Sequence, residues 1–264
     1  MKYQEIIPIK QLQPYVQYFW IIEDMSNNIG VHNFKIIPDG VPTLIYQDIP
    51  NHLTEQSSTH KSPLYVYGQF TKYTNQVIDG PFRIIGVYLK STALKALFNI
   101  DASEFKNKNI DLEDLVSSSV LEQLLNAITV EEKVEILSTF LLSRVTAIKY
   151  SNQKAVYASD LLKEGKELKE VQLEMNISER SLERIFKEHI GMSPKFFSRI
   201  MRFQSSLNLY RNNAFENLTD LTYQSNYFDQ SHLIREFKEF TGVSPKKFLH
   251  KVEEQLINYP KIKE

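Results

Sequence analysis

The sequence predicts an α+β protein, in which a mostly antiparallel β domain with flanking helices precedes an all-α domain of two similar units joined by a long helix. Three observations predict this class. Residues 1–90 alternate short runs of β-branched and aromatic side chains with turn residues, residues 91–150 change to helical spacing, and the last third contains an internal repeat. A chain of 264 residues fits two domains, which we place at 1–150 and 151–264, with the boundary near Tyr150–Gln153.

The first domain begins with short expected strands separated by residues typical of turns. The polar stretch from Asn51 to Ser62 is expected to be a loop. We therefore expect a small, mostly antiparallel sheet. The turn signals are Asn27-Asn28, Pro38-Asp39-Gly40 and Asp79-Gly80-Pro81. The strand-like runs are Val16–Ile22, Phe34–Ile37, Thr43–Gln47, Leu64–Gly68 and Ile84–Leu89.

Helical spacing replaces this pattern after Lys90. Ser91–Phe98 predicts a short helix, and Leu112–Ile148 predicts two helical segments that are broken near Ala127–Val130. The second segment carries an apolar stripe, for which two interpretations stand side by side: it packs on the sheet, or it forms a dimer face. The stripe consists of Val134, Leu137, Leu141 and Val145.

Composition excludes several kinds of chemistry. The chain has no cysteine, which excludes disulfides, thiol nucleophiles and thiolate metal sites and fits a reducing cytoplasm. No apolar run approaches the ~20 residues of a membrane span, and residues 1–10 lack the apolar segment of a signal peptide. We therefore expect a cytoplasmic protein without a membrane partner. The net charge of −1 does not itself indicate nucleic acid, so that argument depends on where the basic residues lie.

No sequence pattern typical of an enzyme is found. The histidines His32, His52 and His60 lack metal-ligand spacing, and Asp39 is explained by its turn. Phosphate-binding loops and nucleophile motifs are missing as well. We expect no catalytic residue, no metal and no cofactor.

An aromatic cluster opens the first long strand. Trp20 lies close in sequence to Tyr15 and Tyr18, and two interpretations apply to these three residues. They belong to the core of the β domain, or they line a pocket for a small-molecule ligand.

The last third of the chain contains two copies of one pattern. The copies run from Ser181 to Phe197 and from His232 to Phe248, and the offset is constant, since 233 − 182 and 245 − 194 both give 51. Duplication at a fixed spacing indicates a repeated structural unit. The residue types that recur are Leu, Arg, Phe, Lys, Glu, Gly, Ser, Pro, Lys and Phe.

Each copy reads as a helix with recognisable ends. Ser178 and Asp229 are good N-caps, and Gly191 and Gly242 suit the left-handed conformation that ends a helix. A shorter helix precedes each copy, and Asn in the intervening stretch suits a sharp turn. A short helix, a tight turn and a second helix together form a helix-turn-helix. The short helices are Leu168–Glu174 and Leu218–Ser225, the turns Met175-Asn176-Ile177 and Asn226-Tyr227-Phe228, and the second helices about 178–190 and 229–240.

The outward faces of the second helices suit double-stranded DNA. Arg and Gln are residue types that read base edges in the major groove, Ile234 suits a thymine methyl group, and Lys187 and Lys238 suit phosphates. A helix from Pro194 to about Arg211 spans roughly 25 Å, comparable with the ~34 Å repeat of one DNA turn, so the two units can read successive major grooves. The predicted contact residues are Ser178, Glu179, Arg180, Glu183, Arg184, Lys187, Gln230, Ser231, Ile234, Arg235 and Lys238.

Structural roles compete for some of these residues. Arg184 and Arg235, which recur at the repeat offset, are also candidates for ion pairs with a neighbouring helix. Glu183 can accept a hydrogen bond from cytosine, but acidic residues beside DNA more often screen a neighbouring arginine.

Residues 154–250 resemble the DNA-binding domain of AraC-type regulators. The resemblance is most specific at Asp229–Lys238 and at Thr241–Pro245, and Ser178–Pro194 also matches. The chain departs from the family pattern at Gln172, where the family has a small residue, and at Asn226-Tyr227, where it has Gly-Phe. The resemblance implies sequence-specific DNA binding that controls transcription, usually as an activator with RNA polymerase as a partner. It also implies a bacterial cytoplasmic protein that is on the nucleoid when bound.

The first 150 residues resemble an uncharacterised domain attached to some of these regulators, through Leu12–Trp20 and Ile37–Gly40. In the family such domains sense a small molecule or mediate dimerisation, so an effector and a homodimer are both implied. A regulator whose first domain only dimerises, and an enzyme or repair protein that its DNA-binding domain merely targets, are the alternative interpretations. The lack of a cysteine nucleophile and of metal ligands weighs against the enzyme.

Overall fold

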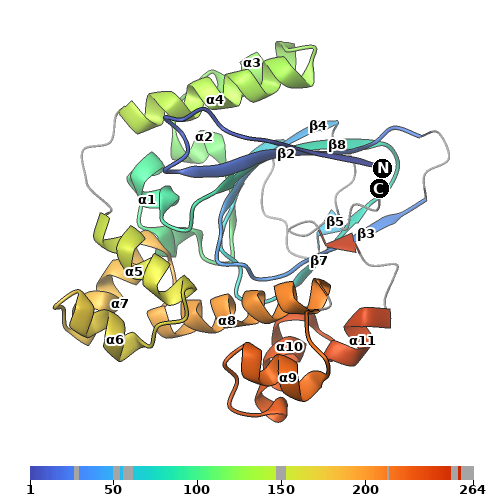
Figure 1. Ribbon diagram of the computed structural model, residues 1–264. Helices are drawn as coiled ribbons and strands as arrows, with labels where there is room; N and C mark the ends of the chain where they lie inside the picture. The colour runs from blue at the N-terminus through green and yellow to red at the C-terminus, as the bar shows by residue number, and fades with distance from the viewer. Residues whose placement is uncertain are drawn as a thin grey trace.

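The computed structural model describes residues 1–26, 30–49, 54–55, 62–146, 153–212, 214–250 and 255–256. A β domain with flanking helices is followed by a helical domain, so the predicted α+β class is confirmed (Figure 1). Most of the predicted boundary at Tyr150–Gln153 lies outside the described residues. Within the described part, no helix is long and apolar enough to cross a membrane.

A six-stranded antiparallel sheet forms the centre of the β domain. Its order is β1-β2-β8-β4-β6-β9, and every neighbouring pair is antiparallel. Four of the predicted strand-like runs lie within this sheet and are confirmed, with ends that differ by one or two residues. These runs are Val16–Ile22, Thr43–Gln47, Leu64–Gly68 and Ile84–Leu89. The strands are β1 (Lys2–Ile6), β2 (Val16–Asp24), β4 (Thr43–Ile49), β6 (Leu64–Tyr67), β8 (Phe82–Leu89) and β9 (Asn109–Asp111).

A second, smaller sheet has the order β10-β3-β7-β5, and its β10–β3 pair is parallel. Its strands are β3 (His32–Ile36), β5 (Thr54–Glu55), β7 (Thr74–Ile78) and β10 (Gln255–Leu256). The predicted loop Asn51–Ser62 is wrong at Thr54–Glu55, which pair with β7. Thr54 and Glu55 pair with β7 through their main chains. Their polar side chains therefore give no strand signal in the sequence.

Strand β2 shows how the central sheet separates two cores. Phe19 and Ile21 point to one face, and Trp20 and Ile22 point to the other, because successive side chains of a strand alternate. The first face packs against the helices α1 (Ala93–Phe98), α2 (Leu112–Leu115), α3 (Val120–Asn126) and α4 (Val130–Thr146), together with the 3-10 turn η1 (Ala102–Phe105). The second face packs against the smaller sheet.

The apolar stripe of α4 belongs to the first of these cores. Val134, Leu137 and Leu141 are buried, and Val145 packs at the edge. The stripe therefore packs on the sheet domain. The predicted break near Ala127–Val130 separates α3 from α4.

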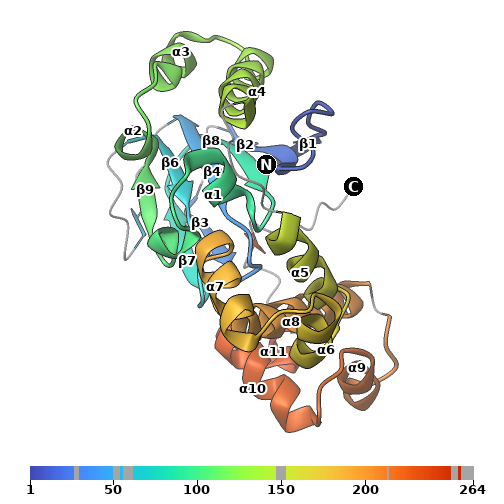
Figure 2. The same ribbon diagram turned by 90° about the vertical axis from the view of Figure 1, so that its left-hand side faces the viewer.

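The helical domain follows the predicted boundaries closely. Helix α6 (Leu168–Glu174) and the connecting helix α8 (Pro194–Arg211) begin and end where the sequence places them. The remaining helices are α5 (Gln153–Lys163), α7 (Glu179–His189), α9 (Leu218–Gln224), α10 (Gln230–Thr241) and α11 (Pro245–His250). Their shared core takes one residue from the β domain, the buried Ile37. The helical domain lies along one end of the β domain in two perpendicular views (Figures 1 and 2).

Candidate functional site

Two helix-turn-helix units carry the candidate interface, α6 with α7 and α9 with α10. Asn176 and Asn226 take the left-handed conformation in the turns, with φ of 49° and 56°. Ser178 Oγ accepts a hydrogen bond from the Ser181 main-chain N–H at 3.3 Å, and Asp229 Oδ1 accepts one from His232 N–H at 2.7 Å. These are the caps and turns that the sequence predicts, and they fix where each second helix begins.

The inner faces of α7 and α10 pack into the helical core. Leu182 and Phe186 of α7 are buried, as are Leu233, Phe237 and Phe240 of α10. The opposite faces point to solvent. All the predicted contact residues are exposed except Ile234, which is half-buried. The exposed positions are Ser178, Glu179, Arg180, Glu183, Arg184, Lys187, Gln230, Ser231, Arg235 and Lys238.

The charges on these outward faces form no ion pair among the described residues. Arg235 donates only to the main-chain carbonyl of Ser231 in its own helix, and the structural ion pair considered for Arg184 and Arg235 does not form in this part of the chain. Glu183 likewise makes no pair with an arginine there. Gln230 Nε2 donates to Thr219 Oγ1 of α9 at 2.5 Å. The outward faces therefore present basic groups that are available to an anionic partner.

Helix α8 holds the second unit through ion pairs with a buried carboxylate. Glu236 of α10 is 3% exposed and accepts hydrogen bonds from Arg199 Nε at 2.7 Å and Arg202 Nη2 at 2.8 Å. Burial alone would raise the pKa of Glu236, but these hydrogen bonds and positive charges hold it below its ordinary value. At the repeat offset of 51, the first unit has Ile185 in place of Glu236. The duplicated units are thus fastened to α8 by different chemistry.

The β domain touches the C-terminal end of α7. Lys95 of α1 forms a 3.3 Å ion pair with Glu188 of α7. Gly191, which ends α7 with φ of 84°, lies against η1: a Cβ there would be 2.5 Å from the carbonyl oxygen of Ala102. The same glycine therefore permits both the helix end and the close approach of the two domains.

The C-terminal end of α10 is held in a similar way. The buried Lys35 of β3 donates from Nζ to the carbonyl oxygen of Thr241 at 3.1 Å, and its ammonium group lies 5.1 Å from the ring centroid of Tyr73. A positive charge at a helix C-terminus is favourable because the last carbonyls carry partial negative charge. Both second helices are thus fastened to the β domain at their C-terminal ends.

A third contact joins the loop of residues 37–42, after β3, to α8. Gln204 Nε2 donates to the carbonyl oxygen of Pro38 at 2.6 Å, and a Cβ on Gly40 would lie 3.0 Å from Phe197 Cε2. Ile37 completes the contact from within the helical core. The predicted turn Pro38-Asp39-Gly40 is therefore an interdomain contact, which the sequence did not reveal.

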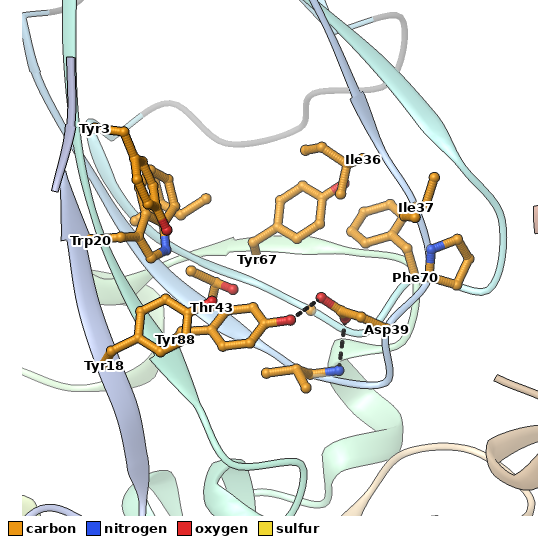
Figure 3. A pocket seen from close by; sticks show the side chains of 14 residues that line it. Tyr3, Tyr18, Trp20, Ile36, Ile37, Asp39, Thr43, Tyr67, Phe70 and Tyr88 are labelled. Atoms are coloured by element: carbon orange, nitrogen blue, oxygen red, sulfur yellow. Dashed lines mark hydrogen bonds between the residues drawn. The ribbon is translucent and has the colours of Figure 1, made fainter. Parts of the chain in front are cut away.

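The same loop forms one wall of a pocket in the β domain (Figure 3). The side chains around it are mostly aromatic or aliphatic and come from both sheets. Asp39 accepts hydrogen bonds from the Val41 main-chain N–H at 2.9 Å and from the Tyr88 hydroxyl. The pocket is lined by Tyr3, Tyr18, Trp20, Ile36, Ile37, Pro38, Asp39, Val41, Thr43, Ile45, Tyr67, Gly68, Phe70 and Tyr88.

Two of the three predicted ligand residues lie at this pocket. Trp20 and Tyr18 share a face of β2, whereas Tyr15 precedes the strand and packs against the core on the helical side. Gly86 of β8 makes room for the indole, because a Cβ there would lie 2.0 Å from Trp20 Cε2. The sequence could place Tyr18 and Trp20 on one face by alternation, but the residues from other strands gave no such signal.

No group of metal-ligating side chains gathers anywhere in the described ranges. His32 pairs with Asp24 at 3.5 Å, and His52 and His60 lie outside the described residues. The described residues therefore offer no candidate metal site.

Two sequence families match the chain. Residues 173–251 match a helix-turn-helix domain, and residues 4–111 match a domain of unknown function, DUF6597. No curated protein sequence matches significantly. Together the two family matches cover both parts of the chain and agree with the two-part fold.

Solved structures of similar arrangement include ToxT from Vibrio cholerae bound to a methylnaphthalenyl butenoic acid, at 12% identity and a TM-score of 0.46, covering 95% of this chain and 99% of that one. The AraC-like transcriptional activator CuxR aligns at 15% identity and a TM-score of 0.21, over 73% of this chain and 74% of that one. The xylose-binding transcription activator xylR aligns at 18% identity and a TM-score of 0.31, over 39% of this chain and 27% of that one. With TM-scores below 0.5, these likenesses carry no inference about this chain.

Proposed function

We propose that this chain is an AraC-type DNA-binding transcription regulator whose recognition helices, α7 and α10, read successive major grooves of one DNA face. AraC-type regulators are transcription factors and not enzymes. The proposed DNA contacts are Ser178, Glu179, Arg180, Glu183, Arg184, Lys187, Gln230, Ser231, Ile234, Arg235 and Lys238.

One observation carries this proposal: each duplicated unit exposes a face whose basic side chains make no ion pair within the described residues. Arg184 and Lys187 on α7 match Arg235 and Lys238 on α10 at the same offset. Helix α8 has 18 residues, so it spans about 27 Å and holds the units at a separation comparable with the ~34 Å DNA repeat.

Different residues on each face take different roles. Arg180 and Gln230 lie in the first turn of their helices, where the helix-turn-helix motif reaches base edges. Lys187 and Lys238 lie about two turns further along, where a helix leaves the groove and meets phosphates. RNA polymerase is the proposed protein partner of the bound regulator.

Residues 1–150 are proposed to regulate this activity by sensing a small molecule. Support comes from the loop of residues 37–42, which lines the aromatic pocket and also contacts α8 at Gln204. A ligand that moves this loop would therefore change its contacts with α8, the helix that joins the two units. The β domain also contacts the two recognition helices directly, through Lys35 at α10 and Lys95 at α7.

Homodimerisation is a second proposed role of the same domain, favoured by one surface. Ile7 and Ile9 are exposed beside α4, at a groove of about 430 Å³ that Leu142 also lines. Apolar side chains that gather at a groove are typical of protein contacts. Sedimentation of the parent chain and of Ile7→Asp tests this role, because the substitution should shift a dimer towards the monomer.

Selection from a random duplex library tests the central proposal. The full chain should enrich two half-sites about one DNA turn apart. Its affinity for them should fall steeply with salt, because neutralising phosphates releases counterions. A chain that is folded by circular dichroism but enriches no sequence would refute the proposal.

A further inference from the structure

We infer that the pocket around Trp20 and Asp39 is a binding site for a small organic cation, such as a quaternary ammonium or a protonated amine. The inference rests on the proposed function, in which this pocket holds the effector, and it names the chemical class of that effector. It follows from the aromatic walls, the position of one carboxylate and the way the loop of residues 37–42 closes the site (Figure 3).

The walls of the pocket resemble an aromatic cage. Tyr18 stacks on Tyr88 with ring centroids 5.0 Å apart, and Tyr67 stacks on Phe70 at 4.4 Å. Aromatic faces carry negative potential, so several of them around one space attract a desolvated cation. The six rings that line the pocket are those of Tyr3, Tyr18, Trp20, Tyr67, Phe70 and Tyr88.

The charge of the pocket has the sign that a cation needs. Asp39 is the charged member of the described lining, and Val41 and Tyr88 hold its carboxylate at the wall of the pocket. Burial, followed by the negative charges of Glu5 and Asp39, raises the pKa of the Tyr18 hydroxyl above its ordinary value. The carboxylates that oppose a phenolate there would also oppose an anionic ligand, and they would attract a cation.

The size of the pocket indicates which wall moves. The centres of water molecules can occupy only about 30 Å³ of this pocket, so a trimethylammonium group needs a wider site. On one side the walls are strands β2, β4 and β8, which are hydrogen-bonded neighbours within the central sheet. On the other side lie the loop and Phe70. The loop and residues 68–70 are the parts of the wall outside the strands, and main-chain hydrogen bonds tie Gly68 to Lys108 and Gln69 to Asn107, so ligand entry should displace the loop.

Displacement of the loop reaches the helical domain through named contacts. Pro38 accepts the hydrogen bond from Gln204 of α8, and Gly40 lies against Phe197 of the same helix. A cation that is bound more tightly with the loop displaced shifts the protein towards that state. The occupied pocket should therefore change DNA affinity by altering how α8 is held.

The chain provides its own probe, because Trp20 is its single tryptophan and lines the pocket. The full chain is titrated with tetramethylammonium, choline and benzyltrimethylammonium while tryptophan fluorescence is followed. The neutral isostere of choline, 3,3-dimethylbutan-1-ol, is titrated in parallel. We expect a saturable change with at least one cation, and for choline an affinity at least about ten times that of the alcohol, since charge-assisted contacts contribute the difference.

Substitutions test which side chains contribute to cation binding. Asp39→Asn should weaken cation binding about ten-fold or more and leave the binding of the alcohol nearly unchanged. Phe70→Leu should weaken cation binding by removing one ring of the cage. The matched controls are Asp79→Asn and Phe228→Leu, which alter exposed residues outside the pocket and should leave binding unchanged.

Three results would overturn the inference: no response to any of the three cations, an alcohol that binds as tightly as choline, or an Asp39→Asn variant that is folded and binds the cations as the parent does. The comparison of choline with its isostere needs no variant and stands even if Asp39→Asn does not fold. Duplex selection on the same preparation separates the two proposals. A chain that binds cations but selects no DNA sequence refutes the proposed function alone, and a chain that selects DNA but binds no cation refutes the ligand class alone.

Discussion

Lys35 Nζ of strand β3 donates a 3.1 Å hydrogen bond to the main-chain carbonyl of Thr241, the last residue of helix α10, across 206 positions of the chain. A residue of the β domain thereby caps a proposed recognition helix. At the end of α7, Lys95 of the β domain pairs with Glu188, and Gly191 lies against the carbonyl group of Ala102. The two proposed recognition helices are therefore fixed relative to the β domain as well as to each other.

The Lys35 contact should contribute measurably to stability. Lys35→Met keeps the length of the side chain but removes the charge and leaves the buried carbonyl of Thr241 without this donor. We expect the free energy of unfolding to fall by about 1.5–3 kcal/mol, the range for a hydrogen bond to a charged group. Urea unfolding measures it, and the exposed Lys72→Met is the control. An equal loss of unfolding free energy in both variants would mean that the hydrogen bond from Lys35 does not contribute to stability.

Gly191→Ala should weaken the packing of α7 against η1. Alanine meets both the positive φ of 84° and the Ala102 carbonyl oxygen, 2.5 Å from the new Cβ. Gly165→Ala is the matched control, because its φ of 88° is similar and its nearest neighbour is 3.8 Å away. The control should lose about 1 kcal/mol for its conformation, and Gly191→Ala roughly 1–3 kcal/mol more for the clash. Thermal or urea unfolding gives both values, and similar losses would place the cost in the backbone alone.

Base reading and phosphate binding should separate on α7. Arg180→Ala should relax the preference at one or two base pairs of one half-site, at a cost of roughly 1–3 kcal/mol there. Lys187→Ala should weaken binding about equally on all sequences and lower the salt slope by about 1. Gln230 and Lys238 should repeat this pattern in the other half-site. If Lys187→Ala alters the selected sequence and Arg180→Ala does not, α7 docks in another orientation.

The helical domain should fold and bind DNA without the β domain. A fragment from Ser151 to the C-terminus retains both helix-turn-helix units but loses Ile37 from its core and the cover on Phe197. We therefore expect specific binding at low salt together with a lower melting temperature than the full chain. Circular dichroism and a salt series measure the two effects. A folded fragment without DNA affinity at low salt would contradict the assignment of the interface to this domain.

Acidification should weaken the interface between the domains through His189. Burial, followed by the positive charge of Lys95, lowers the pKa of His189 from its ordinary 6.5, against the opposing charges of Glu188 and Asp101. The unfolded chain then binds the proton more readily than the folded chain. The stability is complete above about pH 6.5 and is lost as the pH falls from there through the lowered folded-state pKa.

His189→Gln should remove this part of the pH dependence. Urea unfolding at about pH 7.5 and pH 5.5 measures it in parent and variant, because the other titrating groups are common to both. The parent should lose more stability between the two values than the variant does. An equal loss in both proteins would show that His189 makes no contribution.

The helix-turn-helix units were predictable from the sequence because their signals are local. A cap such as Ser178, a turn residue such as Asn176 and a stop such as Gly191 act within a few residues of themselves, so α6, α7 and α8 begin and end close to where the pattern places them. The exposed face of α7 follows from the same helical period.

Tertiary structure alone decided what these units touch. Lys35 meets Thr241 and Gln204 meets Pro38 only because the chain folds back on itself, and nothing near either residue in the sequence marks its partner. The pocket is of the same kind: alternation places Tyr18 and Trp20 on one face of β2, but Asp39, Tyr67, Phe70 and Tyr88 join them through strand pairing and a loop. Helix ends and faces are set by interactions between neighbours along the chain, whereas sites built from distant segments depend on which surfaces pack together, and that is decided by the fold as a whole.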